Sequence, residues 1–270
     1  MKRKRFLYII SRSTWGPVLA HLRQIYVSKI RPIIFYACAS WALVSYDRRP
    51  RWGLTLENLK KLQNLQRDCL VQISGAIVKT PRQMLEKELN IDTVRAFMVR
   101  MVLSQRARFL CGSGEALFTK TYLPVATEED NPYDDLDLHA AGLIKRTKAY
   151  LTKTRGEEVA AQAWLHPRTR NKAINACAKR EAAEQNAEEW DDYRRRRAQR
   201  HEDLPFVVRE DWDPQSLRSY RGLTRAQSTM LLQCRTEVIG LGSMLFDRRV
   251  SYSPALGPCL ECRMLSDDPF

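Results

Sequence analysis

Apolar residues recur at intervals of three and four in the N-terminal part of the chain, and this spacing limits the fold more than any other feature. Between Pro17 and Leu43 they mark one face of an amphipathic helix. Pro32 lacks the N–H that would bond the carbonyl of Ser28, so we expect a kink or two abutting helices there. Glycine and proline are sparse, at 11 and 12 of 270 residues, which favours helices over turn-rich β structure. The sequence therefore predicts an all-α fold.

A second helix is predicted over Leu54–Ile73, with Gly75 as the residue that ends it. One face of this helix carries a narrow stripe at nearly heptad spacing. Such a stripe is usually core, but it would also serve as a docking seam, so a helical scaffold that binds protein is an alternative function. The stripe comprises Leu59, Leu62, Gln66, Cys69 and Ile73.

Capping signals predict where further helices begin. Thr80 and Gln83 fit a capping box, with Pro81 at the first helical position. The stretch VRAFMVRMVLSQRARFL, residues 94–110, continues as a fourth helix, apolar on one side. Near the other end of the chain, Thr224 is the expected N-cap of a helix in a short helical pair.

Composition changes near Thr127, where TEEDNPYDDLDLH carries six acids and no base and is typical of a linker or mobile loop. Residues 140–200 are rich in alanine and charge but weak in apolar periodicity, which indicates a loosely packed, partly disordered basic connector. We therefore divide the chain into a helical bundle at 1–126, an acidic loop and basic helical connector at 127–215, a short helical pair at 216–258, and a cysteine-containing segment at 259–270.

The formal net charge of +14 favours a polyanionic partner such as RNA or DNA, bound without sequence specificity. Arginine dominates the basic stretches, and its planar guanidinium suits phosphates. A merely solvated basic surface is the alternative. The candidate nucleic-acid contacts are Lys2, Arg3, Lys4, Arg5, Arg95, Arg100, Arg106, Arg108, Arg194, Arg195, Arg196 and Arg197.

The cysteines and the hydropathy of the chain indicate its cellular compartment and whether it spans a membrane. The first five of the seven cysteines are isolated and are interpreted as small buried hydrophobes. The N-terminal MKRKRFLYII does not read as a secretory signal, so an intracellular, reducing compartment, nucleus or cytoplasm, is expected. The longest uncharged run, Pro32–Tyr46, has 15 residues. A bilayer span needs about 20, so no membrane helix is expected.

Cys259 and Cys262 have the spacing of half a zinc site. Structural zinc takes four ligands, and only eight residues follow Cys262. We therefore expect an incomplete half-site that binds Zn²⁺ weakly at best, and no other cofactor. The four histidines, all upstream and without ligand spacing, are His21, His139, His166 and His201.

Three stretches resemble successive blocks of non-LTR (LINE-type) retrotransposon reverse transcriptase polyproteins of the fungal type, downstream of the polymerase domain. They are TWGPVLAHLRQIYVSKIRPIIFYACASWAL, LQNLQRDCLVQISGAIVKTPRQMLEKELNI and YRGLTRAQSTMLLQCRTEVIGLGSMLF. The resemblance implies that the first two blocks form a helical thumb and linker that grips the template–primer duplex. It implies that the third block leads into a CCHC zinc knuckle, and that the chain is a piece of such a polyprotein truncated at both ends.

The chain departs from that family at the catalytic centre. The polymerase motif is Tyr-x-Asp-Asp after a strand, and its carboxylates hold two Mg²⁺ ions. PYDDLDL places Tyr133, Asp134 and Asp135 at a different spacing and without a flanking β run. We therefore predict a non-catalytic fragment with non-specific nucleic-acid binding and no catalytic residue. An active RNA-directed DNA polymerase or nuclease is the remaining alternative.

Overall fold

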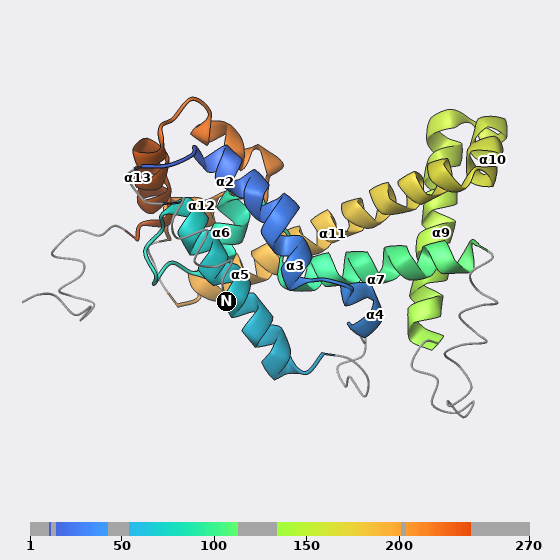
Figure 1. Ribbon diagram of the computed structural model, residues 1–270, viewed down its shortest axis with the longest axis horizontal. Coiled ribbons are helices and arrows are strands. Elements are labelled where there is room, and N and C mark those ends of the chain that lie inside the picture. Colours follow the sequence, from blue (N-terminus) through green and yellow to red (C-terminus); the bar gives the residue numbers. More distant parts are fainter. Residues whose placement is uncertain (1–10, 12–14, 43–53, 113–133, 201–203, 239–270) are drawn as a thin grey trace, which may run out of the picture. The chain divides into compact units, whose positions relative to one another are not determined.

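The computed structural model describes residues 11, 15–42, 54–112, 134–200 and 204–238. Every regular element among them is a helix, so the all-α prediction is confirmed (Figure 1). The elements are α2 (Leu19–Ile25), a π-helical turn (Tyr26–Ile30), α3 (Arg31–Ile34), α4 (Cys38–Trp41), α5 (Leu56–Ser74), α6 (Arg82–Glu88), α7 (Val94–Leu110), α9 (Asp134–Arg155), α10 (Glu157–Leu165), α11 (Pro167–Ala198), α12 (Phe206–Arg209), a 3₁₀ helix (Pro214–Tyr220) and α13 (Arg225–Thr236).

The chain forms two compact units, and each is assembled from segments that are distant in the sequence. Unit 1 comprises Met1–Tyr26, Arg67–Asn90 and Arg194–Phe270, and unit 2 comprises Val27–Gln66 and Ile91–Tyr193. The sequence divides the chain into consecutive regions instead, because local composition carries no signal for pairing between distant segments. Helices α5 and α11 each contribute residues to both units.

The core of unit 2 is built around α7. Val94, Met98 and Val102 are buried along this helix at intervals of four residues. Burial of each such side chain contributes about 1.5–3 kcal/mol. Leu59 and Leu62, from the predicted stripe on α5, pack against the same cluster. The stripe is therefore core at these positions. The other buried members are Phe35, Cys38, Ala42, Leu103, Ala107, Leu136, Ala140, Leu143, Ile174, Cys177 and Ala178.

The N-terminal helix is interrupted where Pro32 predicts it. The π-helical turn Tyr26–Ile30 directly precedes α3, in which Pro32 is the second residue. A proline that cannot donate to the preceding turn favours such a local widening. A second break follows at Ala37, whose φ of 52° is left-handed, and Trp41 Nε1 donates to the carbonyl of Tyr36 at 2.8 Å across it. The prediction of a kink or abutting helices is confirmed.

In unit 1, one face of α13 closes the C-terminal end of α5. Arg225 donates to the carbonyls of Ile73 at 2.7 Å and of Gln72 at 3.3 Å. Thr229 Oγ1 donates to the carbonyl of Ser74 at 3.3 Å. The last carbonyls of a helix have no partner within the helix, so these bonds satisfy groups that would otherwise be buried unpaired.

The predicted capping box at Thr80 and Gln83 is wrong. Helix α6 begins at Arg82 with Pro81 at the N-cap and no side-chain cap bond, and Thr80 Oγ1 is buried without a hydrogen-bond partner. A capping box forms instead at α13, where Thr224 accepts from the Gln227 N–H and the Gln227 side chain accepts from the Thr224 N–H. The N-cap predicted at Thr224 is confirmed.

The stretch predicted as an acidic loop is helical from Asp134 onward, as the start of α9. Leu136, Ala140 and Leu143 lie on one face of this helix and are buried in the core of unit 2. That apolar spacing outweighs the acidic composition on which the loop prediction was based. Residues 134–200 form α9, α10 and α11 in succession, whereas the second half of the predicted 216–258 helical pair, from residue 239, lies outside the described residues.

Candidate nucleic-acid interface

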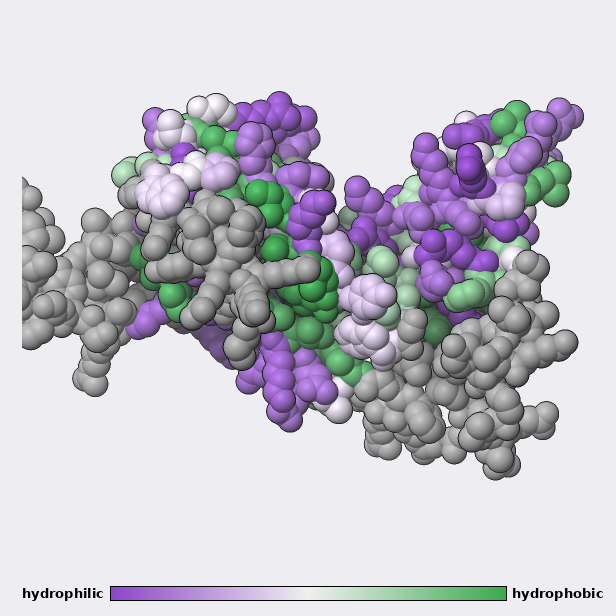
Figure 2. Space-filling model, viewed as in Figure 1, coloured by the Kyte–Doolittle hydropathy of each residue, from purple (hydrophilic) through white to green (hydrophobic). Residues whose placement is uncertain are grey.

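The positive charge of the chain is concentrated in residues 145–180, which we call the basic segment. These residues include ten lysines and arginines and two glutamates, a formal charge of +8 out of the chain's +14. They span the second half of α9, all of α10 and the first part of α11, within unit 2. In Figure 2, hydrophilic residues cover much of the visible surface around α9, with hydrophobic side chains among them at the α10 end.

Local sequence explains how the basic segment folds back on itself. Gly156, with φ of 80°, separates α9 from α10 in a left-handed conformation that glycine adopts readily. Lys148 of α9 lies over the ring of Trp164 of α10, 5.0 Å from its centroid. Pro167 starts α11 at a first-turn position, which proline tolerates because no N–H is needed there.

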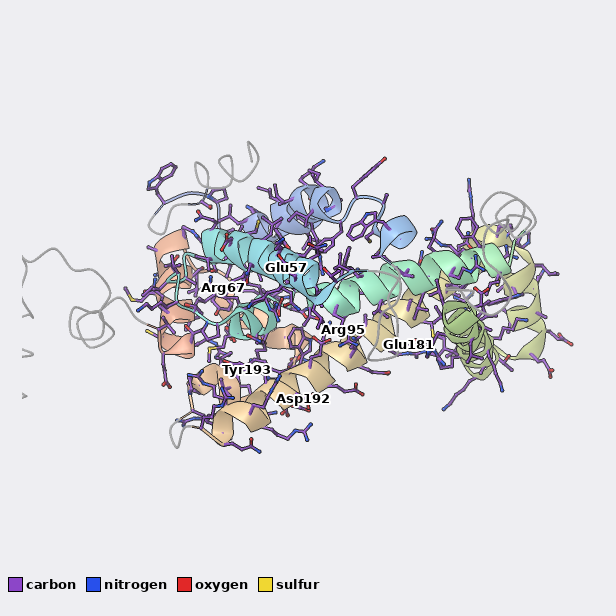
Figure 3. All side chains as sticks on the ribbon, turned by 90° about the horizontal axis from the view of Figure 1, so that it is seen from below. Glu57, Arg67, Arg95, Glu181, Asp192 and Tyr193 are labelled. Atoms are coloured by element: carbon purple, nitrogen blue, oxygen red, sulfur yellow. The ribbon has the colours of Figure 1, made fainter. Side chains whose placement is uncertain are left out.

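An ion pair joins α9 to α11. Arg146 donates from Nε and Nη2 to the two carboxylate oxygens of Glu181, at 2.7 and 3.1 Å. Figure 3 labels Glu181 on α11 beside α9. Such a bidentate pair fixes the geometry of two helices even where solvent weakens its energy.

Most of the other charges of the basic segment point to solvent. Among the residues that the structure describes, six of its cations are exposed and have no ion-pair partner. Exposed, uncompensated cations on rigid helices are the groups that contact phosphate oxygens. The six are Lys145, Lys153, Arg155, Arg168, Lys172 and Lys179.

The arginines predicted on α7 differ in their environments. Arg95 is exposed at the first turn (Figure 3). Arg100 lies 3.4 Å from the Asp92 carboxylate, and Arg106, only 8 % exposed, donates to both carboxylate oxygens of Asp137. A phosphate would have to displace these carboxylates.

Arg108 of α7 is also engaged within the protein. Its guanidinium donates to the carbonyl of Ser104 at 3.0 Å and to the side chain of Gln105 at 2.7 Å. Both partners lie on the same helix, so these bonds orient the side chain along α7.

The arginine run at the end of α11 is partly engaged within unit 1. Arg194 donates to the carbonyl of Val208 at 3.0 Å and to the carboxylate of Asp211 at 2.5 Å. Arg195 and Arg196 are exposed, and Arg197 is half-buried. Lys2, Arg3, Lys4, Arg5, Cys259 and Cys262 lie outside the described residues.

None of the nucleic-acid contacts predicted from the sequence lies in the basic segment, because those predictions follow the N-terminal cations, the arginines of residues 94–110 and the dense run at 194–197. Residues 194–197 are four arginines in succession, whereas the cations of 145–180 are mostly separated by alanines and other neutral residues. Helical folding brings residues three and four apart onto one face and so concentrates spaced charges. The net charge summed over a few tens of consecutive residues is the sequence signal that identifies the basic segment.

Unit 1 holds a second cluster of charged groups, in its interior. The carboxylate of Glu88 is fully buried and accepts hydrogen bonds from the Tyr220 hydroxyl and from Nε and Nη2 of Arg235, the last two at 2.9 and 3.0 Å. Glu210 accepts from Lys87 and from Arg235. The two cations, Lys87 and Arg235, thus balance the charges of the two carboxylates, Glu88 and Glu210.

The pKa values in this cluster follow from burial and pairing. Desolvation by burial, with the neighbouring Glu88 charge, raises the pKa of Tyr220 above its usual range, so its hydroxyl remains a donor. Burial opposes ionisation of Glu210, but hydrogen bonds from Lys87 and Arg235 hold the pKa of Glu210 below its usual value. A neutral, fully bonded network of this kind fits a structural role.

Comparisons with protein-family models, with curated proteins and with solved structures find no match for this chain. Among the described residues, no group of three or more histidine, cysteine or acidic side chains is arranged to hold a metal ion. No described helix is both long enough and apolar enough to cross a bilayer.

Proposed function

We propose that this chain binds RNA or DNA without sequence preference, through phosphate contacts of the basic segment, and that it does so without catalysis. The observation that carries the proposal is the charge of +8 on residues 145–180. Six of their exposed cations have no ion-pair partner among the described residues, so binding a polyanion through these six breaks no ion pair. Release of counterions from the nucleic acid drives such binding.

We also propose kinship with the region that follows the polymerase domain in non-LTR retrotransposon reverse transcriptases. Two of the three resembling blocks supply the residues that meet in unit 1, which supports their origin as one folded region. Gly75 lies in the second block, and Arg225 and Thr229, which close the end of α5, lie in the third. In this proposal the helices of the chain correspond to those that support the polymerase domain in that family. A primer-extension assay with Mg²⁺ is therefore expected to show no nucleotide incorporation.

A pair of variants with equal charge tests the binding site. Lys153→Gln, Lys172→Gln and Lys179→Gln together remove three exposed cations of the basic segment. Lys29→Gln, Lys60→Gln and Arg221→Gln together remove three exposed cations elsewhere. The first variant is expected to weaken binding of a labelled oligonucleotide by about ten-fold or more at low salt, and the second to have a clearly smaller effect.

The outcome separates a localised site from a diffuse charge effect. Equal losses for the two variants would mean that net charge alone governs binding and would remove the assignment to the basic segment. Circular dichroism of both variants checks that their helical content matches the unmodified chain.

A further inference from the structure

An exposed aromatic ring lies within the basic segment. Tyr150 of α9 is 45 % exposed. The guanidinium of Arg180, from α11, lies over this ring, 4.3 Å from its centroid. Arg180 also donates to Cys177 Sγ at 3.6 Å, which anchors the guanidinium at its position above the ring. Tyr150 and Arg180 therefore form a preorganised stack at the surface of two helices.

Cations surround this stack. Lys153 is three residues from Tyr150 and so lies on the same side of α9, and Lys179 precedes Arg180 on α11. Both lysines are exposed. An aromatic ring and a guanidinium plane both stack on nucleobases, and neighbouring cations hold the adjoining phosphates.

Unpaired bases fit this arrangement better than a duplex. Bases in a duplex are stacked on one another and present only their edges in the grooves, so a ring on a helix surface finds no base face there. In a single strand every base has a free π-face.

An anionic membrane surface fits less well. The strongly exposed apolar side chains of the basic segment are Val159 and Leu165 of α10, and the charged residues of that helix are Glu157 and Glu158. A helix that lies in an anionic interface carries cations beside its apolar face instead.

We propose that the basic segment binds single-stranded nucleic acid in preference to duplex, with a base stacked on the Tyr150–Arg180 pair. This inference rests on the proposed function and specifies its substrate class. Phosphate contacts from Lys153 and Lys179 hold the strand, and the ring supplies contact with the base without sequence selection.

The test compares Tyr150→Leu and Tyr150→Phe, using a labelled oligothymidylate and a duplex of the same length. Leucine keeps an apolar side chain but removes the π-system, whereas phenylalanine keeps the ring. Tyr150→Leu is expected to weaken single-strand binding by at least about five-fold and to leave duplex binding within about two-fold, because stacking acts only on unpaired bases. Tyr150→Phe is expected to bind like the unmodified chain.

A photocrosslink provides a readout that a purely structural tyrosine would not give. An oligonucleotide that carries 5-iodouracil is expected to crosslink to the peptide containing Tyr150, as identified by mass spectrometry. Equal losses of single-strand and duplex binding in Tyr150→Leu, or a crosslink found only elsewhere, would overturn the stacking inference and leave the proposed function standing. Failure of both nucleic acids to bind, with or without binding to phosphatidylserine vesicles, would overturn the proposed function itself.

Discussion

Thr229 of α13 lies directly against Gly75, the residue that ends α5. A Cβ added to Gly75 would stand 2.5 Å from Thr229 Oγ1 and 2.8 Å from its Cγ2, and Gly75 itself has a φ of +72°. Glycine is thus required here both by the backbone conformation and by the close approach of a second helix. The contact joins residues 154 positions apart in the chain.

Gly75→Ala is therefore expected to destabilise the protein more than Gly222→Ala. Gly222 has a similar φ of +77° but nothing within 4 Å of an added Cβ, so alanine there meets only the left-handed backbone cost, about 1–2 kcal/mol. At Gly75 displacement of Thr229 adds about 1–3 kcal/mol. Thermal unfolding of both variants measures the difference. Equal melting temperatures would show that α13 does not pack on this turn.

Tyr220→Phe tests the buried cluster of unit 1. The substitution removes a hydroxyl that donates to the fully buried Glu88 carboxylate. A hydrogen bond to a charged group contributes about 1.5–3 kcal/mol, so the free energy of unfolding in urea is expected to fall by that amount. Tyr150→Phe is the matched control, because Tyr150 is exposed, and it should change stability by less than about 0.5 kcal/mol. A Tyr220→Phe protein as stable as the control would contradict the network.

The same cluster predicts a loss of stability in acid. The folded-state pKa of Glu210 lies below its ordinary value of 4.5, so its ionised form stabilises the folded protein. That contribution is present above pH 4.5 and is lost as the pH falls through the lower folded-state pKa. Between pH 4.5 and that lower pKa, the melting temperature of Glu210→Gln should therefore depend less on pH than the melting temperature of the unmodified protein. If the melting temperature of Glu210→Gln falls with pH as steeply as that of the unmodified protein, Glu210 is not paired in solution.

The prediction of at most weak zinc binding rests on the sequence alone, because Cys259 and Cys262 lie outside the described residues. Two thiolates leave half of a tetrahedral site unfilled, so bound Zn²⁺ is expected to be removed readily by a chelator. Metal analysis before and after dialysis against EDTA measures this. Zinc that stays at one per chain after the chelator would mean that further ligands complete the site.

Local signals predict the helices of this protein well. The helix expected over residues 94–110 coincides with α7, and Gly75 ends α5 as its position indicates. These features depend on periodicity and turn chemistry within a few residues. Thr80 shows how such a signal fails, because its sequence fits a capping box while its hydroxyl is buried without a partner.

Long-range relationships were not predictable in this way. The bond between Arg235 and Glu88 spans 147 residues, and nothing in the composition of either segment indicates the other. The division into two units depends on such pairings. The basic segment is the opposite case. Its charges are visible in the sequence, but composition alone predicts a loose connector where the structure has three helices, α9, α10 and α11.

The dependence of nucleic-acid affinity on salt tests the central claim most directly. If the exposed cations of residues 145–180 bind phosphates, log affinity should fall linearly with log salt concentration, with a slope of about 0.7 per contact for a single strand. Lys153→Gln, Lys172→Gln and Lys179→Gln together should reduce that slope by about two. A flat response, or a slope that the three substitutions leave unchanged, would contradict a phosphate-binding surface on these helices.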